Sequence, residues 1–329
     1  MKFLEQVFAT AESLFKFARA QDYGWPLRQG RAGWAIVTNL RRQREIFQLL
    51  RRPAFASLRL PDARFAFKYA VTNYLARGLT HRERADCFLH HYRRLHEEFS
   101  ADLLRRTFDC DVTLFETRKG GCHYSVAMSV AKKSDFREGE LILELKAEGA
   151  RIYVLQFTVV PGSIVQSPSR DVLLISRLQG VRGRYAQIHS ATKDIQEIAP
   201  PALLVTVLHG IAKAWGVTEM AGVSATSQTC FGDDDPEMFH KAYDEFFLEL
   251  GATQANAKFF ACPFQENKPI APVRNGHKSR KRKKRAFKLH VANEVSRMIR
   301  EGNAEPCELP NALILQPREE ISARSLIPA

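Results

Sequence analysis

The chain has 329 residues, of which 45% are hydrophobic and 26% are charged, and its formal net charge is +13. These figures are typical of a soluble globular protein with one large domain or two modest ones. No stretch approaches eighteen uninterrupted apolar residues, so no transmembrane helix is expected. The six cysteines are widely spaced and form no CxxC pair, which argues against a zinc ribbon and for reduced thiols in a cytosolic protein.

The first region, residues 1–107, is predicted to be helical. Apolar residues recur at helical spacing over 4–18, and acidic residues such as Glu5 interrupt the apolar core that a signal peptide needs. We expect this helix to pack on its own domain; the alternative is a helix that binds a membrane surface or a partner. Further along, Glu83 follows Thr80 by three residues, the spacing of a capping box.

Residues 108–275 are predicted to form a mixed sheet flanked by helices. Alternating stretches rich in Val, Ile and Phe predict four strands between 112 and 161, and 171–179 predicts a fifth. After them we expect helices at 184–195, 201–216 and 233–251, and short strands at 218–226 and 258–264. Hairpins followed by strand–helix alternation are typical of an α+β fold with a mixed, largely antiparallel central sheet.

The C-terminal part is predicted to be a basic amphipathic helix at 276–303 and a loosely ordered tail at 304–329. Eight basic residues and no acid lie within 278–288, which leaves a net charge of 5 for the rest of the chain. This segment is either a solvated face or a site for an anionic partner, nucleic acid or an anionic membrane surface. No aromatic residue interleaves with the basic run before Phe287, which argues against a base-stacking platform. The residues assigned to this anionic-partner site are Lys278, Arg280, Lys281, Arg282, Lys283, Lys284 and Arg285.

Several short strings resemble the VirK/YbjX family of Gram-negative bacteria. They are SRLQG at 176–180, ATK at 191–193, PALL at 201–204, GVS at 222–224 and YDEFF at 243–247, followed by the basic stretch. The resemblance covers roughly residues 60–300 and departs at Phe247, where the family pattern has tryptophan. It implies a soluble protein linked to virulence, envelope maintenance or resistance to antimicrobial peptides, and it implies no reaction. We expect a cytoplasmic location, either free or peripheral at the inner membrane.

The element order is also similar to that of the acyl-CoA N-acyltransferase superfamily. There a central strand ends in a glycine turn, and the next helix points its N-terminus at the coenzyme's pyrophosphate; free amides and the positive end of a helix bind anions in general. Gln179 and Gly183 frame the matching turn here, one residue further apart than in the family pattern. The resemblance implies acyl-CoA as the ligand. The ligand-binding residues expected are Arg177, Gln179, Gly180, Arg182, Gly183, Arg184, Tyr185 and Lys193.

The catalytic residue is not identified by this resemblance. Many such transferases carry a proton-donating tyrosine four residues before the glycine that ends the last helix, and Phe247 stands at that position ahead of Gly251. Tyr243, one turn earlier, and the neighbouring Asp244 are the candidates; otherwise Tyr243 and Phe247 are core residues.

No metal-binding spacing is present elsewhere. His90, His91 and His96 do not lie at i,i+4, and we expect them to be solvated. The acidic run at 233–235 lacks the alternating spacing of a calcium loop and suits a helix cap at Asp235. Two hypotheses remain: an acyltransferase-like protein that uses the 173–195 junction, and a non-catalytic adaptor or regulator that uses the basic segment.

Overall fold

The computed structural model describes residues 33–55, 63–70, 73–131, 137–231, 236–264 and 275–302. The helix expected at 4–18, the cap expected at Asp235 and the tail at 304–329 lie outside these residues. Within them the fold is α+β, as predicted, and is built on one eight-stranded, mostly antiparallel sheet with the strand order β1-β2-β3-β4-β5-β6-β8-β7.

The first five strands form an antiparallel meander, and the later strands extend it. Gly120, Gly121 and Gly149 have φ angles of 59°, 78° and 74°, which allow the tight turns of the first and third hairpins. The β5–β6 pair is parallel and needs the crossover that the helices between the two strands supply. The strands are β1 (Val112–Lys119), β2 (Cys122–Val130), β3 (Leu141–Ala147), β4 (Ala150–Pro161), β5 (Asp171–Gly180), β6 (Glu219–Val223), β7 (Thr253–Gln254) and β8 (Phe259–Pro263).

The helices begin and end largely where local chemistry predicts. Thr80 and Glu83 form the expected capping box, with Glu83 Oε2 accepting from the Thr80 amide at 2.7 Å, and Gly216 ends α8 in the left-handed conformation. The helix expected at 233–251 is interrupted by a π-helical turn, η6 (His240–Glu245). The α-helices are α3 (Leu40–Leu50), α5 (His81–Glu98), α6 (Ala101–Asp109), α7 (Tyr185–Asp194), α8 (Pro200–Trp215), α9 (Pro236–Phe239), α10 (Phe246–Glu249) and α11 (Asn275–Glu301). The 3-10 segments are η1 (Pro53–Phe55), η2 (Ala63–Ala70), η4 (Gly162–Val165) and η5 (Ala225–Ser227).

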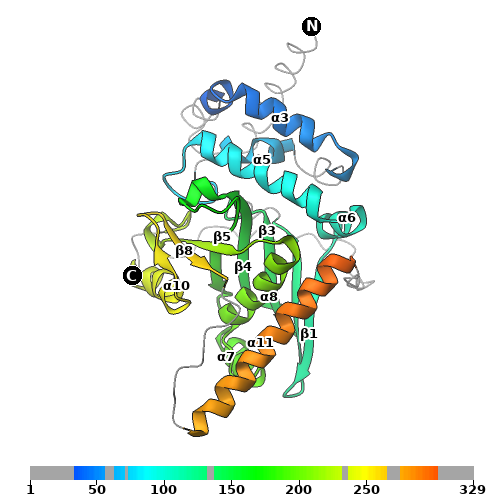
Figure 1. Ribbon diagram of the computed structural model, residues 1–329, viewed down its shortest axis with the longest axis vertical. Coiled ribbons are helices and arrows are strands. Elements are labelled where there is room, and N and C mark those ends of the chain that lie inside the picture. The colour runs from blue at the N-terminus through cyan, green and yellow to red at the C-terminus, as the bar shows by residue number, and fades with distance from the viewer. Residues whose placement is uncertain are drawn as a thin grey trace, which may run out of the picture.

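The helices enclose the sheet from two directions. In Figure 1, α3 and α5 cover one end of the sheet, whereas α8 and the long α11 lie side by side across one face. Gly210 lets α8 and α11 approach closely, because a Cβ there would lie 2.6 Å from the carbonyl oxygen of Ala292. The α11 helix is therefore anchored by its second half, and its basic first half extends toward α7 (Figure 1).

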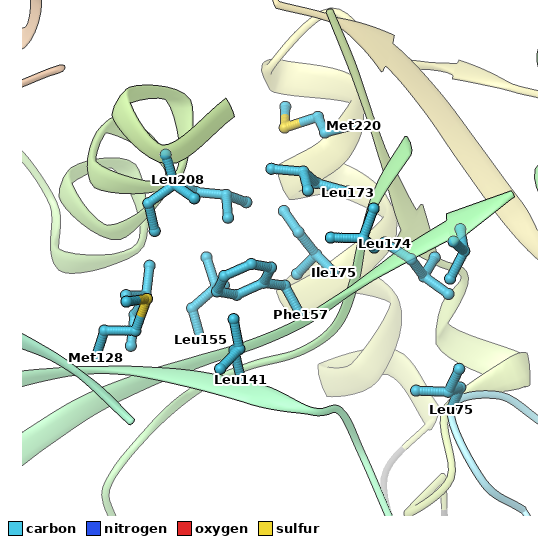
Figure 2. Packing of buried hydrophobic residues seen from close by; sticks show 14 of the residues in the cluster. Leu75, Met128, Leu141, Leu155, Phe157, Leu173, Leu174, Ile175, Leu208 and Met220 are labelled. Carbon is cyan, nitrogen blue, oxygen red and sulfur yellow. The ribbon is translucent and has the colours of Figure 1, made fainter. Parts of the chain in front are cut away.

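The core is continuous from the sheet to these helices. Figure 2 shows Leu155 and Phe157 of β4, Leu173 and Ile175 of β5, and Leu208 of α8 packed together, and all five are fully buried. Burial of this kind of apolar surface is the dominant stabilising term in folding. This core therefore holds β4 and β5 together as far as Ile175, after which the register between the two strands shifts.

A buried polar cluster joins the N-terminal helices to the sheet. We call the four residues Lys68, Tyr74, Tyr92 and Glu140 the Glu140 cluster. Lys68 Nζ donates to Glu140 Oε2 at 3.1 Å and to the Gly139 carbonyl at 3.0 Å, while both tyrosine hydroxyls donate to the same carboxylate. Both charged side chains are completely buried. Burial lowers the pKa of Lys68, and its attraction to Glu140 offsets part of that shift.

The expectation that the α5 histidines are solvated was wrong for His91. Its side chain is completely buried, and its Nδ1 accepts a hydrogen bond from the Val159 amide of β4 at 3.1 Å. Burial, followed by the nearby charge of Lys68, lowers the pKa of His91 well below its usual value. His91 is therefore a neutral structural residue.

Candidate functional site

The parallel pairing of β5 with β6 is short, and the two strands diverge after three residue pairs. Only three residue pairs join them, the last being Ile175 with Gly222. β5 continues to Gly180, and its register with β4 shifts around Ser176, which marks a bulge. Along 176–180 no strand among the described residues lies beside the side of β5 that faced β6, and the Leu178 amide there is directed toward a residue after β6.

Tyr243 lies against this free edge of β5. The Leu178 amide donates to the Tyr243 hydroxyl at 3.5 Å, a long hydrogen bond. Phe247 packs directly under Gly222, where an added Cβ would meet the aromatic ring at 2.1 Å. Both aromatic side chains are buried, as the core interpretation predicted. Burial raises the pKa of Tyr243 well above its usual value, so this hydroxyl stays protonated at physiological pH.

Beside Tyr243 lies a group of polar residues that the sequence did not single out. We call Glu138, Arg177, Thr229, Cys230 and Tyr243 the Glu138 site. The Glu138 carboxylate pairs with Arg177 Nη1 at 2.9 Å and accepts from Thr229 Oγ1 at 3.1 Å. The Glu138 carbonyl accepts from the Ser176 hydroxyl at the bulge. This carboxylate thus connects the segment before β3, the bulged part of β5 and the loop after β6.

The exposed thiol of Cys230 responds to the same carboxylate. Partial burial and then the charge and hydrogen bond of Glu138 raise the pKa of Cys230 to about 11, and Arg177 opposes that shift. The thiol is therefore largely protonated and poorly nucleophilic at neutral pH. A carboxylate, a guanidinium, a thiol and a phenol converge here on the end of one parallel strand pair.

The predicted anion turn leads from β5 into α7, and its residues are open to solvent. Arg182 and Tyr185 are exposed, and Gly183 has a φ of 78° with open space where a Cβ would be. The Arg184 amide donates to the Val181 carbonyl at 3.1 Å, so it is not one of the free amides at this helix start. No side chain caps α7 and its first turn carries no acid, so this helix start can accept an anion.

The other predicted ligand residues separate from this turn. Gln179 accepts from Arg177 Nε at 3.2 Å, and Gly180 pairs with Tyr153 as the last residue of β5. Lys193 lies near the opposite end of α7, where it lines a cavity together with Arg280, Lys283 and Lys284 of α11. The structure therefore places one residue of the predicted turn site with the predicted basic segment. Lys278 lies within α11 as well.

Asp244 and Ser224 have structural partners. Asp244 Oδ1 accepts from the Ala225 amide at 2.8 Å, and its Oδ2 lies 2.6 Å from His240 Nδ1. The buried Ser224 hydroxyl donates to the Ala257 carbonyl at 2.9 Å. These contacts fix the loop after β6 against η6, which in turn holds Tyr243 at the free edge of β5.

Neither a metal-binding side-chain group nor a membrane-spanning helix occurs among the described residues. The described residues contain no group of three or more His, Cys, Asp or Glu side chains placed to hold a metal ion. A membrane span needs a long apolar helix, and none occurs in the ranges that the structure describes.

The fold and the site define an α+β protein in which one parallel strand pair within a largely antiparallel sheet opens toward a cluster of polar side chains. Residues 34–296 match the family model described as "Protein of unknown function (DUF535)". The chain therefore belongs to the DUF535 family. Comparison with curated proteins and with solved structures gives no match.

Proposed function

We propose that this protein is acyltransferase-like and binds an acyl thioester such as acyl-CoA where β5 and β6 diverge. The observation that carries the proposal is the free edge of β5 at 176–180, which runs straight into the glycine turn and the uncapped start of α7. A strand edge can pair with the amide groups of an extended ligand, much as it pairs with another strand. The long Leu178–Tyr243 hydrogen bond is one that such a ligand can replace at little cost.

The residues around the edge suit the parts of such a ligand. The free amides at the start of α7, with Arg182 beside them, suit the pyrophosphate of a coenzyme A carrier. The Tyr243 hydroxyl lies next to the edge and can protonate a departing thiolate. The Glu138 carboxylate pairs with Arg177 of β5 and accepts from Thr229, and it can accept the proton of an attacking amine.

Ligand titration of the full chain tests the proposal. Acetyl-CoA and a long-chain acyl-CoA are expected to raise the melting temperature by a few degrees at concentrations well above Kd, since a ligand that binds only the folded state stabilises it. Arg182→Glu should remove the shift, whereas Lys119→Glu on the β1–β2 hairpin, whose turn lies against Asp194 at the other end of α7, should keep it. Absence of any shift in the wild type at millimolar ligand would refute acyl-CoA binding.

A turnover measurement separates chemistry from binding. Tyr243→Phe keeps the ring and removes only the hydroxyl, so the melting shift should persist while release of free thiol from acyl-CoA falls at least tenfold. Equal turnover in the two proteins would remove Tyr243 from the mechanism and leave a ligand-binding protein.

A second candidate function is a non-catalytic adaptor or regulator that binds an anionic membrane surface, nucleic acid or a protein partner through its basic C-terminal segment. It is favoured by the exposure of Lys281, Arg282 and Lys283 on α11. The resemblance to the VirK/YbjX family suggests a peripheral location at the inner membrane and a role in virulence, the envelope or resistance to antimicrobial peptides. If alanine replacement across 280–285 abolishes peptide resistance in cells while Tyr243→Phe has no effect, this candidate is favoured. Liposome flotation and a DNA gel shift would then distinguish its partners.

A further inference from the structure

The cavity that Lys193 lines lies between the C-terminal end of α7 and the first half of α11. Its volume is about 580 Å³, and four cationic side chains, Lys193, Arg280, Lys283 and Lys284, line it together with Phe287 and His290. We call it the basic cavity. It lies at the other end of α7 from the glycine turn, so the two sites do not share residues.

The basic run is sorted by helix geometry into two sets. Arg280, Lys283, Lys284 and Phe287 recur at i, i+3, i+4 and i+7 and therefore share one face of α11. Lys281 and Arg282 belong to the same run but do not line the cavity, and both are exposed. Part of the positive charge of this segment therefore lies around the basic cavity.

Among the described residues that line the cavity, Glu197 is the one carboxylate. It pairs with Arg280 and with Lys284 Nζ, the latter at 3.1 Å, while its carbonyl accepts from the same Nζ at 3.0 Å. Gln196 and Glu197 have φ angles of 52° and 55°, an uncommon left-handed conformation for non-glycine residues that turns the chain after α7 toward α11. The Glu197 carboxylate therefore faces four cationic side chains of the same protein.

We propose that the basic cavity binds a small molecule or headgroup that carries a phosphate. Lys193 and Lys283 have no acidic partner among the described residues and would contact the phosphate directly. Because phosphate makes charge-assisted hydrogen bonds in several directions, it also competes with the Glu197 carboxylate for Arg280 and Lys284. The half-buried ring of Phe287, packed edge-on against Phe115, offers an apolar surface to the remainder of the ligand.

Calorimetric titration with inorganic pyrophosphate tests this site, in the full chain carrying Arg182→Glu so that the proposed acyl-CoA site at the start of α7 does not contribute. Lys283→Gln and Lys193→Gln should each weaken binding about tenfold, the usual size of one lost charge-assisted contact. Lys281→Gln removes the same charge from a residue of the basic run that does not line the cavity, and it should change affinity less than twofold. Glu197→Gln should tighten binding because it removes the competing carboxylate.

A parallel arm uses phosphatidylcholine vesicles that contain phosphatidic acid. Binding in solution without flotation indicates a soluble phosphate ester; flotation with the same dependence on Lys283 and not on Lys281 indicates a lipid headgroup, and both support the site. If Lys281→Gln and Lys283→Gln weaken binding equally, the proposal is overturned in favour of diffuse charge on α11. A DNA gel shift in which both variants bind DNA equally weakly would have the same meaning. Absence of binding in both arms, or weaker binding by Glu197→Gln, would also overturn it. Arg182→Glu should leave pyrophosphate binding here intact, so this site and the proposed acyl-CoA site can fail independently.

Discussion

Two glutamates separated by one residue, Glu138 and Glu140, have opposite surroundings. Glu140 and its partner Lys68 are completely buried, and two tyrosine hydroxyls complete the contacts of the carboxylate. The Glu138 side chain is 13% exposed and its partner Arg177 is 21% exposed, beside a thiol at the surface. The same short segment before β3 thus supplies one carboxylate to the interior and one to a site that solvent reaches.

This difference shows which of the two charges is available for chemistry. A buried ion pair with satisfied hydrogen bonds contributes little net stability relative to apolar residues, but loss of one partner is costly because the other charge stays buried. A carboxylate near the surface keeps room for a second molecule and can exchange protons with it. We therefore interpret the Glu140 cluster as structural and the Glu138 site as the reactive counterpart.

The largest expected effect is that of Lys68→Met. The substitution keeps side-chain length but leaves Glu140 buried without a cation, so the free energy of unfolding should fall by about 3–5 kcal/mol. Urea unfolding followed by circular dichroism measures the loss. Lys119→Met, at an exposed lysine of β1, should stay within about 0.5 kcal/mol of the wild type. A similarly small change for Lys68→Met would show that water reaches this cluster and would remove the contrast with Glu138.

Local signals in the sequence predicted much of the fold and little of these two environments. The capping box at Thr80 depends on neighbouring residues and occurs as expected, and Gly120, Gly121 and Gly216 have the positive φ angles that hairpin turns and helix ends favour. The contacts of Glu138 with Arg177 and Thr229 join residues far apart in the chain, and Glu138 itself lies in the connection before β3. No periodic pattern marks such a residue.

One misreading could have been avoided from the sequence. His91 follows Phe88 by three residues and precedes Leu95 by four, so it lies on the same helix face as two residues that are buried. Its burial was therefore encoded in the helical spacing. By contrast, the meeting of Lys193 with α11 depends on how α7 and α11 are arranged in space, which spacing along one helix cannot predict.

A smaller effect is expected from acid on the α5 side of the molecule. The unfolded chain protonates His91 near pH 6.5, whereas burial keeps the folded chain from doing so until a lower pH. Below pH 6.5 the unfolded state then binds more protons, and the free energy of unfolding falls by at most about 1.4 kcal/mol per pH unit from this group. Urea midpoints between pH 7.5 and pH 5 measure the slope.

Two variants isolate this contribution. His91→Gln should reduce the fall in the free energy of unfolding below pH 6.5, because glutamine cannot take up a proton. His189→Gln, at an exposed histidine of α7, should keep the wild-type slope. If the pH dependence of the free energy of unfolding is unchanged in His91→Gln, water reaches His91 before the protein unfolds. The contrast between this buried region and the Glu138 site, which solvent reaches, would then weaken.

The smallest effect, and the most direct test of the Glu138 site, is the reactivity of Cys230. With a pKa of about 11, its thiolate is scarce at pH 8, and alkylation by iodoacetamide should be roughly tenfold or more slower than that of an unperturbed thiol. Glu138→Gln removes the charge that raises this pKa and should speed alkylation several-fold. Arg177→Gln removes the opposing cation and should slow it. Mass spectrometry of the peptide that contains Cys230 follows each rate separately from the other cysteines. Rates that move in the same direction in both variants would indicate altered exposure of the thiol, whereas opposite changes would demonstrate that Glu138 and Arg177 act on Cys230 through their charges.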